Sequence, residues 1–238
     1  MNNKANTVLV TGANRGLGAA IAAVFHDAGW HVMGTARDPG TLAKANVDSA
    51  YALDLSDIGS LEALVSAIKG TDRRIDLLIN NAGFNPKDKT GDPTYFRSTF
   101  AIEEFSATNV AESMWINALM PTQLVSSLLP SLADDAVVLN ISSWLGSIGN
   151  KDMGGHYGYA GSKALLNMMT RGIALEWERT ARAAVALNPG WMQTDMGGSK
   201  ATRTPQDTAA DILGLYQAGA LKRANGCFIN TDGSQHAW

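Results

Sequence analysis

Tyr159 and Lys163 are four positions apart, a pair whose residue types and spacing could transfer a proton. Because the surrounding pattern is helical, both side chains would lie on one helix face, one turn apart. A phenol with a pKa of about 10 is a poor acid or base at neutral pH, but a neighbouring ammonium favours the phenolate and lowers that pKa. The pair could then give a proton to a carbonyl oxygen or take one from an alcohol. The same spacing is common on exposed helices, so it needs support from other motifs.

A glycine-rich run, TGANRGLG over residues 11–18, lies between the first apolar stretch and a helical pattern. Gly12 would allow a tight turn, Gly16 would let a diphosphate approach the backbone, and Gly18 would let the helix pack closely on the sheet. The unpaired N–H groups and partial positive charge of a helix N-terminus favour a phosphate at this point. The run predicts a dinucleotide site. The alternative is an ordinary strand-to-helix joint that binds no ligand.

Arg15 and Arg37 bear on which dinucleotide would bind. Arg37 ends the predicted second strand, where an acidic residue would hold a ribose 2′-hydroxyl and an arginine would accommodate a 2′-phosphate. Two guanidiniums could hold one phosphate through charge-assisted hydrogen bonds. The sequence therefore favours NADP(H). NAD(H) is the alternative, since Asp38 could instead bind a 2′-hydroxyl.

Strands and helices alternate along the chain and would position these residues. Short apolar runs predict strands near Thr7–Thr11, His31–Thr35, Ala50–Leu53, Leu77–Asn80, Ala136–Ile141, Ala183–Asn188 and Gly226–Asn230. Helical patterns predict helices near Gly16–Ala28, Ser60–Lys69, Ser106–Ser131, Tyr159–Arg179 and Pro205–Gly219. This alternation implies βαβ units and a parallel sheet with helices on both faces. We predict a single doubly wound α/β domain over residues 1–238, with about seven strands.

Composition excludes several classes of protein. Hydrophobic residues make up 45% of the chain and charged residues 17%, which is enough for a substantial core. The formal charge of −3 disfavours nucleic acid as a partner, because proteins that neutralise many phosphates usually carry a basic excess. One cysteine excludes an internal disulfide, and the four histidines form no ligand pattern, so no metal site is expected. Neither a signal peptide nor a membrane span is predicted, so we expect a cytoplasmic protein without a membrane partner.

Further motifs follow the later strands in a set order. They are Asp54-Leu55, NNAG at 80–83, Asn117 in the long helix, NISS at 140–143, YAGSK at 159–163 and PGWMQT at 189–194. With the glycine run, these motifs make the sequence similar to the short-chain dehydrogenase/reductase family over essentially its whole length. The segments after Ser143 and from Pro189 to Gly198 resemble the carbonyl-reductase branch, which contains C-factor-like and sniffer-like proteins.

The resemblance implies a Rossmann fold and roles for individual residues. The catalytic set that it implies is Ser143, Tyr159, Lys163 and Asn117. Ser143, the second serine of the pair, would hydrogen-bond the reacting oxygen; Lys163 would reach the nicotinamide ribose; Asn117 would hold a water that links Lys163 to solvent. The cofactor-binding residues expected from the glycine run and the resemblance are Gly12, Asn14, Arg15, Gly16, Leu17, Gly18, Arg37, Asp54, Leu55, Asn81, Ala82, Gly83, Tyr159, Lys163, Pro189, Gly190, Trp191 and Thr194.

Hydride transfer between NADP(H) and a small carbonyl or alcohol substrate is the activity that the resemblance implies. An NADP(H)-binding regulator that acts through a protein partner is the alternative, although the intact set of Ser, Tyr, Lys and Asn argues against it. Family members assemble through helices similar to Ser106–Ser131 and Tyr159–Arg179. We therefore expect a homodimer or homotetramer.

Three segments with little pattern would shape the substrate pocket: Phe84–Phe105, Trp144–His156 and Asp195–Thr204. The first is polar and irregular, so a long loop is expected there. Asp195–Thr204, called the lid segment below, is expected to be mobile, with Gly197 and Gly198 as hinges. The substrate-facing part of the site is thus expected to be built from loops.

Overall fold

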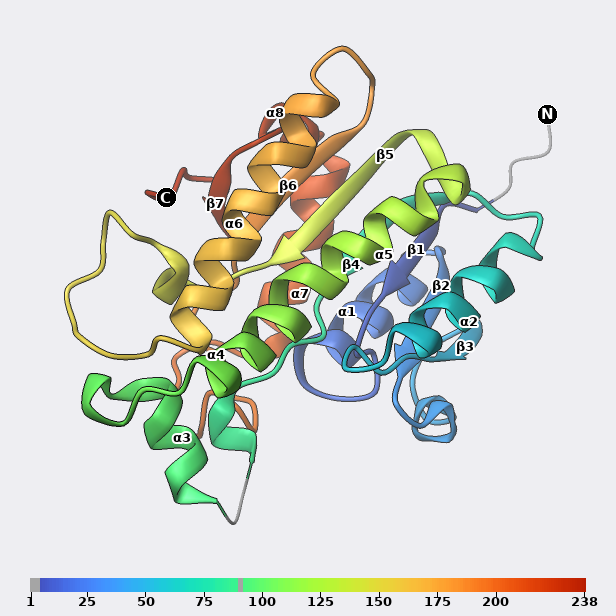
Figure 1. The fold of residues 1–238 in the computed structure, drawn as a ribbon. Coiled ribbons are helices and arrows are strands. Elements are labelled where there is room, and N and C mark those ends of the chain that lie inside the picture. Colours follow the sequence, from blue (N-terminus) through green and yellow to red (C-terminus); the bar gives the residue numbers. More distant parts are fainter. Residues whose placement is uncertain (1–4, 90–91) are drawn as a thin grey trace.

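A seven-stranded parallel sheet runs through the computed structural model, which describes residues 5–89 and 92–238 (Figure 1). Neighbouring strands are parallel and lie in the order β3-β2-β1-β4-β5-β6-β7. Their bounds are β1 Thr7–Val10, β2 His31–Ala36, β3 Ser49–Ala52, β4 Ile75–Asn80, β5 Leu132–Ile141, β6 Ala183–Asn188 and β7 Phe228–Asn230. The chain moves outward from β1 to β3 and then returns to place β4 on the other side of β1. The predicted doubly wound sheet is confirmed, and such sheets bind ligands at the carboxyl ends of the strands beside this reversal.

Helices cover both faces of the sheet (Figure 1). One face carries α1 (Gly16–Asp27), α7 (Pro205–Gln217) and α8 (Ala220–Arg223), and the other carries α2 (Ile58–Lys69), α5 (Met120–Leu128) and α6 (Tyr159–Glu176). In β1, Val8 and Val10 belong to the first core and Leu9 to the second. Successive strand side chains point to opposite faces, so a strand covered on both sides is apolar throughout. This is why the predicted strands lack a polar alternation.

The single helix predicted over Ser106–Ser131 is wrong, because the structure divides this segment. α4 (Ala107–Met114) leads into a π-helical turn, η4 (Trp115–Leu119), and α5 follows, with a final 3-10 turn, η5 (Leu129–Ser131). Pro121 has no N–H to donate to the carbonyl group of Asn117, four residues earlier, which weakens the α-helical pattern here. A π turn redirects the side chains around it and is frequent at functional sites. Asn117 lies at the centre of this turn.

The expectation of an irregular loop over Phe84–Phe105 is wrong in part. Residues 90 and 91 of this segment lie outside the described residues. The described part contains helix α3 (Pro93–Phe100) and two 3-10 turns, η2 (Pro86–Asp88) and η3 (Ile102–Glu104). The segment is therefore a small structured insertion between β4 and α4.

Local sequence explains why α3 forms. Asp92 begins it, because its Oδ1 accepts hydrogen bonds from the N–H groups of Thr94 and Tyr95, each at 3.0 Å. Pro93 fits the first turn, where no N–H is needed. Tyr95 and Thr99, one turn apart, are both buried. A capped helix with one buried face thus replaces the predicted loop.

The remaining elements agree with the sequence prediction within a few residues. Each predicted strand overlaps an observed one, although β5 begins at Leu132 rather than at Ala136. α7 begins at Pro205, as predicted, and Thr204 and Asp207 form a capping box before it. In the described parts of the chain, no helix is both long and apolar enough to cross a membrane.

Candidate active site

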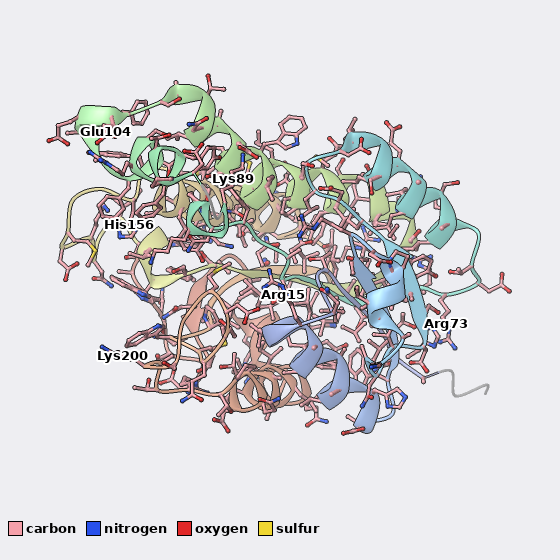
Figure 2. All side chains as sticks on the ribbon, turned by 90° about the horizontal axis from the view of Figure 1, so that it is seen from below. Arg15, Arg73, Lys89, Glu104, His156 and Lys200 are labelled. Atoms are coloured by element: carbon pink, nitrogen blue, oxygen red, sulfur yellow. The ribbon has the colours of Figure 1, made fainter. Side chains whose placement is uncertain are left out.

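A cavity of about 630 Å³ lies at the carboxyl ends of the strands and gathers most of the predicted site residues. Those that line it are Gly12, Asn14, Arg15, Gly16, Leu17, Arg37, Asp54, Leu55, Asn81, Ala82, Gly83, Tyr159, Lys163, Pro189 and Thr194. Figure 2 shows Arg15 near the centre of the view from below, with Lys89 nearer α4. One cavity therefore joins the glycine turn to the predicted proton-transfer pair.

The remaining predicted site residues, as far as the structure is described, do not line this cavity. They are Gly18, Asn117, Ser143, Gly190 and Trp191. Gly190 turns the chain after Pro189 with φ +78°. The indole of Trp191 is half exposed, and its Nε1–H donates to the Gly197 carbonyl at 2.7 Å, so this side chain packs on the lid segment. Contact of Gly190 and Trp191 with a cofactor stays a prediction.

The glycine turn has no room for a side chain at Gly18, and its backbone has a positive φ at Gly12 and Gly16. A Cβ at Gly18 would lie 2.0 Å from the Gly12 carbonyl oxygen and 2.6 Å from Asn81 Nδ2, and Gly12 and Gly16 have φ values of +67° and +55°. α1 then begins at Gly16 without a side-chain cap from any described residue, and its first turn holds no acidic residue. An uncapped helix N-terminus behind a glycine turn is the arrangement that suits an anionic phosphate.

Charged residues gather where β2 and β3 end. Asp38 Oδ1 accepts a hydrogen bond from the Gly40 N–H at 2.8 Å. Asp54 accepts bonds from the N–H (2.8 Å) and the hydroxyl (2.7 Å) of Ser56, and these bonds, with a smaller effect of Arg37, lower its pKa. Both carboxylates are thus engaged within their own turns. The exposed guanidinium of Arg37 is the group at this end that suits an anion.

Tyr159 and Lys163 meet at the start of α6. Lys163 Nζ lies 5.8 Å from the centre of the Tyr159 ring and donates a 2.8 Å hydrogen bond to the carbonyl oxygen of Ile141, the last residue of β5. Burial lowers the pKa of Lys163 to about 8. The sheet therefore holds the ammonium close to the phenol, and that ammonium loses its proton more readily than an exposed lysine does.

Asn117 lies close to Lys163, and both side chains border Gly83. Its Nδ2 donates to the Phe84 carbonyl (2.8 Å) and to Ser162 Oγ (2.9 Å), and its Oδ1 accepts from the Phe84 N–H (2.7 Å). A Cβ at Gly83 would lie 3.4 Å from Asn117 Oδ1 and 3.7 Å from Lys163 Nζ. The π turn thus places Asn117 where it joins the segment after β4 to α6. Its predicted part in a proton relay stays a prediction.

The two serines after β5 have different environments. Ser142 Oγ donates to Asn167 Oδ1 at 2.6 Å, so its proton is committed to α6. Ser143 Oγ accepts a bond from the Leu145 N–H at 3.2 Å, which leaves its own hydroxyl proton to donate elsewhere. Ser142 lines the cavity, whereas Ser143 is buried and does not line it. The donor capacity favours Ser143 over Ser142, and contact of Ser143 with a substrate stays a prediction.

The lid segment and the insertion supply cavity residues that the sequence did not single out. Met192 and Met196 come from the chain around the lid segment, and Lys89, Glu112 and Ile116 from the insertion and the helix that follows it. Lys89 and Met196 lie in segments that the sequence predicted to shape the pocket, and Met192 lies in the PGWMQT motif. Glu112 and Ile116 lie within five positions of Asn117. The sequence thus indicated the segments, and tertiary contacts decide which of their residues line the cavity.

An ion pair at the rim joins the insertion to α4. Lys89 Nζ lies 2.7 Å from Glu112 Oε2 and 4.0 Å from the centre of the Tyr95 ring, and the Tyr95 hydroxyl donates to the same oxygen at 2.5 Å. Burial alone would raise the pKa of Glu112, but the bonds from Lys89 and Tyr95 outweigh it and lower that pKa. Within residues 5–89 and 92–238, no group of three or more His, Cys, Asp or Glu side chains is arranged to hold a metal ion.

The insertion also supports the loop that leads to Tyr159. The N–H groups of His156 (3.1 Å) and Gly158 (2.9 Å) donate to the carbonyls of Phe100 and Thr99. His156 has φ +61°, and its ring lies edge-on to Phe100 with the ring centres 4.4 Å apart. Burial, with smaller effects of Lys151 and Lys87, lowers the pKa of His156. This histidine packs against α3 rather than lining the cavity.

Comparison with known proteins identifies the family, since the family described as short chain dehydrogenase matches residues 6–205. The chain belongs to this family of oxidoreductases. The C-signal of Myxococcus xanthus is 32% identical to this short-chain dehydrogenase over 166 residues, 69% of this chain and 93% of that protein. The carbonyl reductase Sniffer of D. melanogaster has a TM-score of 0.84 at 28% identity, covering 98% of this chain and 100% of its own. An NADPH-bound carbonyl reductase from chicken fatty liver has a TM-score of 0.82 at 28% identity, covering 99% and 100%. The predicted resemblance is confirmed.

Proposed function

We propose that this short-chain dehydrogenase transfers a hydride reversibly between NADP(H) and a ketone, aldehyde or alcohol. One observation carries the proposal: a single cavity contains both the glycine turn with its uncapped helix N-terminus and the Tyr159–Lys163 pair. The first suits a diphosphate, and the second suits proton transfer at an oxygen. The carbonyl reductases among the similar structures, one of them with NADPH bound, support the same activity.

The residues present fit a nicotinamide dinucleotide, which would supply or accept the hydride. The backbone from Gly12 to Leu17, with Thr194 opposite, would hold the diphosphate, because a Cβ at Gly16 would lie 3.6 Å from Thr194 Cγ2. Arg15 and Arg37 would bind the 2′-phosphate, and Asp54 and Leu55 would border the adenosine. The nicotinamide would then lie toward Pro189 and Tyr159.

Proton transfer falls to Tyr159 in this proposal. The Lys163 ammonium favours the phenolate, so the phenol is a stronger acid than a free tyrosine. Tyr159 protonates the carbonyl oxygen during reduction and deprotonates the alcohol during oxidation. Ser143 donates a hydrogen bond to the same oxygen, and Asn117 takes part in returning the proton from solvent.

The experiment is NADPH oxidation against a panel of ketones and aldehydes, with Tyr159→Phe and Tyr157→Phe compared. Tyr157 is the matched control, since its ring packs edge-on to Phe105 at 5.6 Å and lies outside the cavity lining among the described residues. We expect Tyr159→Phe to lose about 10²–10⁴-fold in kcat, the range typical of a general acid, and Tyr157→Phe to stay within a few-fold of wild type. Full activity of Tyr159→Phe would contradict the mechanism.

Cofactor choice is tested by the ratio of kcat/KM for NADPH to that for NADH. Arg37→Ala should lower this ratio about tenfold, because one charge-assisted hydrogen bond to the 2′-phosphate is lost. Arg179→Ala, which removes an exposed charge beyond α6, should leave the ratio unchanged. A constant ratio in Arg37→Ala would remove this residue from the proposal.

A regulatory role is the second candidate, because one relative carries the name C-signal. A regulator that only binds NADPH would oxidise it with no substrate of the panel, although it would still bind the cofactor. We also propose a homo-oligomer formed through η4 and α6, since Trp115 and Leu119 in η4 and Met168 and Leu175 in α6 are exposed apolar side chains. Light scattering after size exclusion measures its mass.

A further inference from the structure

Arg15 makes a contact that its proposed cofactor role does not use. Its Nη1 lies 2.7 Å from Oδ2 of Asp195, the first residue of the lid segment. Both side chains are exposed, 62% for Arg15 and 82% for Asp195, and both residues line the cavity. The ion pair connects the glycine turn after β1 with the chain after β6. It therefore ties the lid segment to the nucleotide end of the site.

The start of the lid segment is a compact turn. The Gly197 N–H donates to Thr194 Oγ1 at 3.1 Å, and the Gly198 N–H donates to the Thr194 carbonyl at 2.7 Å. Asp195 and Met196 lie inside this turn, so a displacement of one carries the other with it. Met196 Sδ lies 3.9 Å from the Tyr159 hydroxyl, where the oxygen of a substrate would bind. The position of Asp195 is thus coupled to the cover over Tyr159.

We propose that Asp195 is a specificity-determining residue: its carboxylate holds the Arg15 guanidinium until the 2′-phosphate of NADP(H) takes its place. The inference rests on the proposed NADP(H) site. The Asp195 carboxylate and the 2′-phosphate compete for the Arg15 guanidinium. The lid segment stays tied to the glycine turn only while Asp195 is bound. A nucleotide without a 2′-phosphate leaves the pair intact and Met196 over Tyr159. A nucleotide with one frees the lid segment, and the substrate can then approach Tyr159.

The exposure of the pair sets the size of the effect. Exposed ion pairs contribute little to stability, so a 2′-phosphate can displace Asp195 at a modest loss of affinity. Removing the carboxylate should therefore tighten binding of a 2′-phosphorylated nucleotide about two- to fivefold. The same change should leave other nucleotides unaffected.

Two fragments test the competition without any turnover: 2′,5′-ADP, which carries the 2′-phosphate, and 5′-AMP, which does not. Their Kd values are measured by calorimetry for wild type, Asp195→Asn and Arg15→Gln. Asp152→Asn is the control, because it removes the same charge from an exposed loop residue outside the cavity lining of the described structure. Hydrogen exchange of residues 194–204 reports whether the lid segment is freed.

We expect Asp195→Asn to bind 2′,5′-ADP two- to fivefold tighter than wild type and 5′-AMP equally well, with no change for Asp152→Asn. In wild type, 2′,5′-ADP should speed exchange in the lid segment and 5′-AMP should not; in Asp195→Asn exchange should be fast from the start. Arg15→Gln should reduce the preference for 2′,5′-ADP to the part that Arg37 supplies, and in that background Asp195→Asn should no longer change the Kd of either fragment. An equal effect of Asp195→Asn on both fragments, or lid exchange that ignores 2′,5′-ADP, overturns the proposal. If wild type itself shows no preference for 2′,5′-ADP, the NADP(H) assignment fails, and the competition with it.

Discussion

The glycine turn and the lid segment border the same cavity but are built by different means. Around Gly18 the main chain packs so closely that a Cβ would approach a carbonyl oxygen to 2.0 Å. The lid segment is tied by a pair of exposed side chains, Arg15 and Asp195. Close backbone packing tolerates no substitution, whereas a surface ion pair changes with one residue at little cost in stability. The proposed nucleotide end of the site is therefore shaped by the main chain, whereas the lid segment beside Tyr159 is held by replaceable side chains.

Lys163 gives the largest expected effect, because its proposed role in proton transfer requires a buried ammonium, which costs stability. Lys163→Met should lower kcat about 10²–10⁴-fold, since Tyr159 loses the charge that favours its phenolate. The same variant should be more stable than wild type at pH 7, on the order of 3 kcal/mol, because no buried ammonium remains. Urea unfolding measures this difference in unfolding free energy. If Lys163→Met were less stable than wild type at pH 7, the buried ammonium would not be the destabilising group that we infer.

The pH dependence of that difference follows from the lowered pKa. The pKa of Lys163 is about 8 in the folded protein and 10.5 in a free lysine, so the unfolded state binds more protons between these values. Wild-type stability should therefore rise relative to Lys163→Met as the pH increases from about 8 to about 10.5. Lys69→Met, at an exposed lysine at the end of α2, should show no such trend.

Gly18→Ala tests the close packing of the glycine turn and should have the next largest effect. Its Cβ would meet the Gly12 carbonyl oxygen, so we expect a loss of about 1–3 kcal/mol or more in unfolding free energy, together with weaker NADPH binding. Gly172→Ala is the matched control in α6, where a Cβ would meet no described atom within 4 Å. That variant should gain about 0.5–1 kcal/mol. Equal stabilities for the two variants would refute the close-packing argument.

His156, in the loop before Tyr159, should have the smallest effect. Its φ of +61° is strained for a β-branched residue and acceptable to asparagine. His156→Val should therefore lose about 1–2 kcal/mol more than His156→Asn, since both lose the same ring contact with Phe100. It should also lower kcat more, because the loop before Tyr159 shifts. Thermal unfolding and NADPH oxidation compare the two, and identical behaviour would mean that the backbone conformation is not needed.

Sequence reasoning predicted the rigid parts of the molecule well. The strands could be predicted from the sequence because burial on both faces requires uninterrupted apolar runs, such as Val8 to Val10. The glycine turn was readable because its spacing reflects a backbone geometry that other residues cannot adopt. Tyr159 and Lys163 were readable because a helix turns a spacing of four into one shared face.

Of the missed features, the π turn and the Arg15–Asp195 ion pair depend on contacts between distant segments, whereas α3 had a local signal. The π turn at Asn117 arises where a proline interrupts the helix and the amide finds partners at Phe84 and Ser162. α3 was hidden by polar residues, although Asp92-Pro93 is a helix-start signal. The pairing of Arg15 with Asp195 joins residues 180 positions apart, and no local pattern marks it. Periodicity and motif spacing describe one element at a time, so the π turn and the Arg15–Asp195 pair could not be predicted from them.

The hydrogen bonds that link the ends of β1 and β4 determine when the proposed nucleotide site can form during folding. Asn81 donates from its N–H to Thr11 Oγ1 (3.0 Å) and from its side chain to the Thr11 carbonyl (2.9 Å), across a separation of 70 residues. This part of the site can therefore form only when the ends of β1 and β4 meet. Their meeting closes a loop that contains β2, β3 and α2, and closing so long a loop is slow in folding. We therefore expect an incompletely folded chain to bind no nucleotide. A higher cofactor concentration should accordingly raise the melting temperature of the whole sheet, because the cofactor binds and stabilises only completely folded chains.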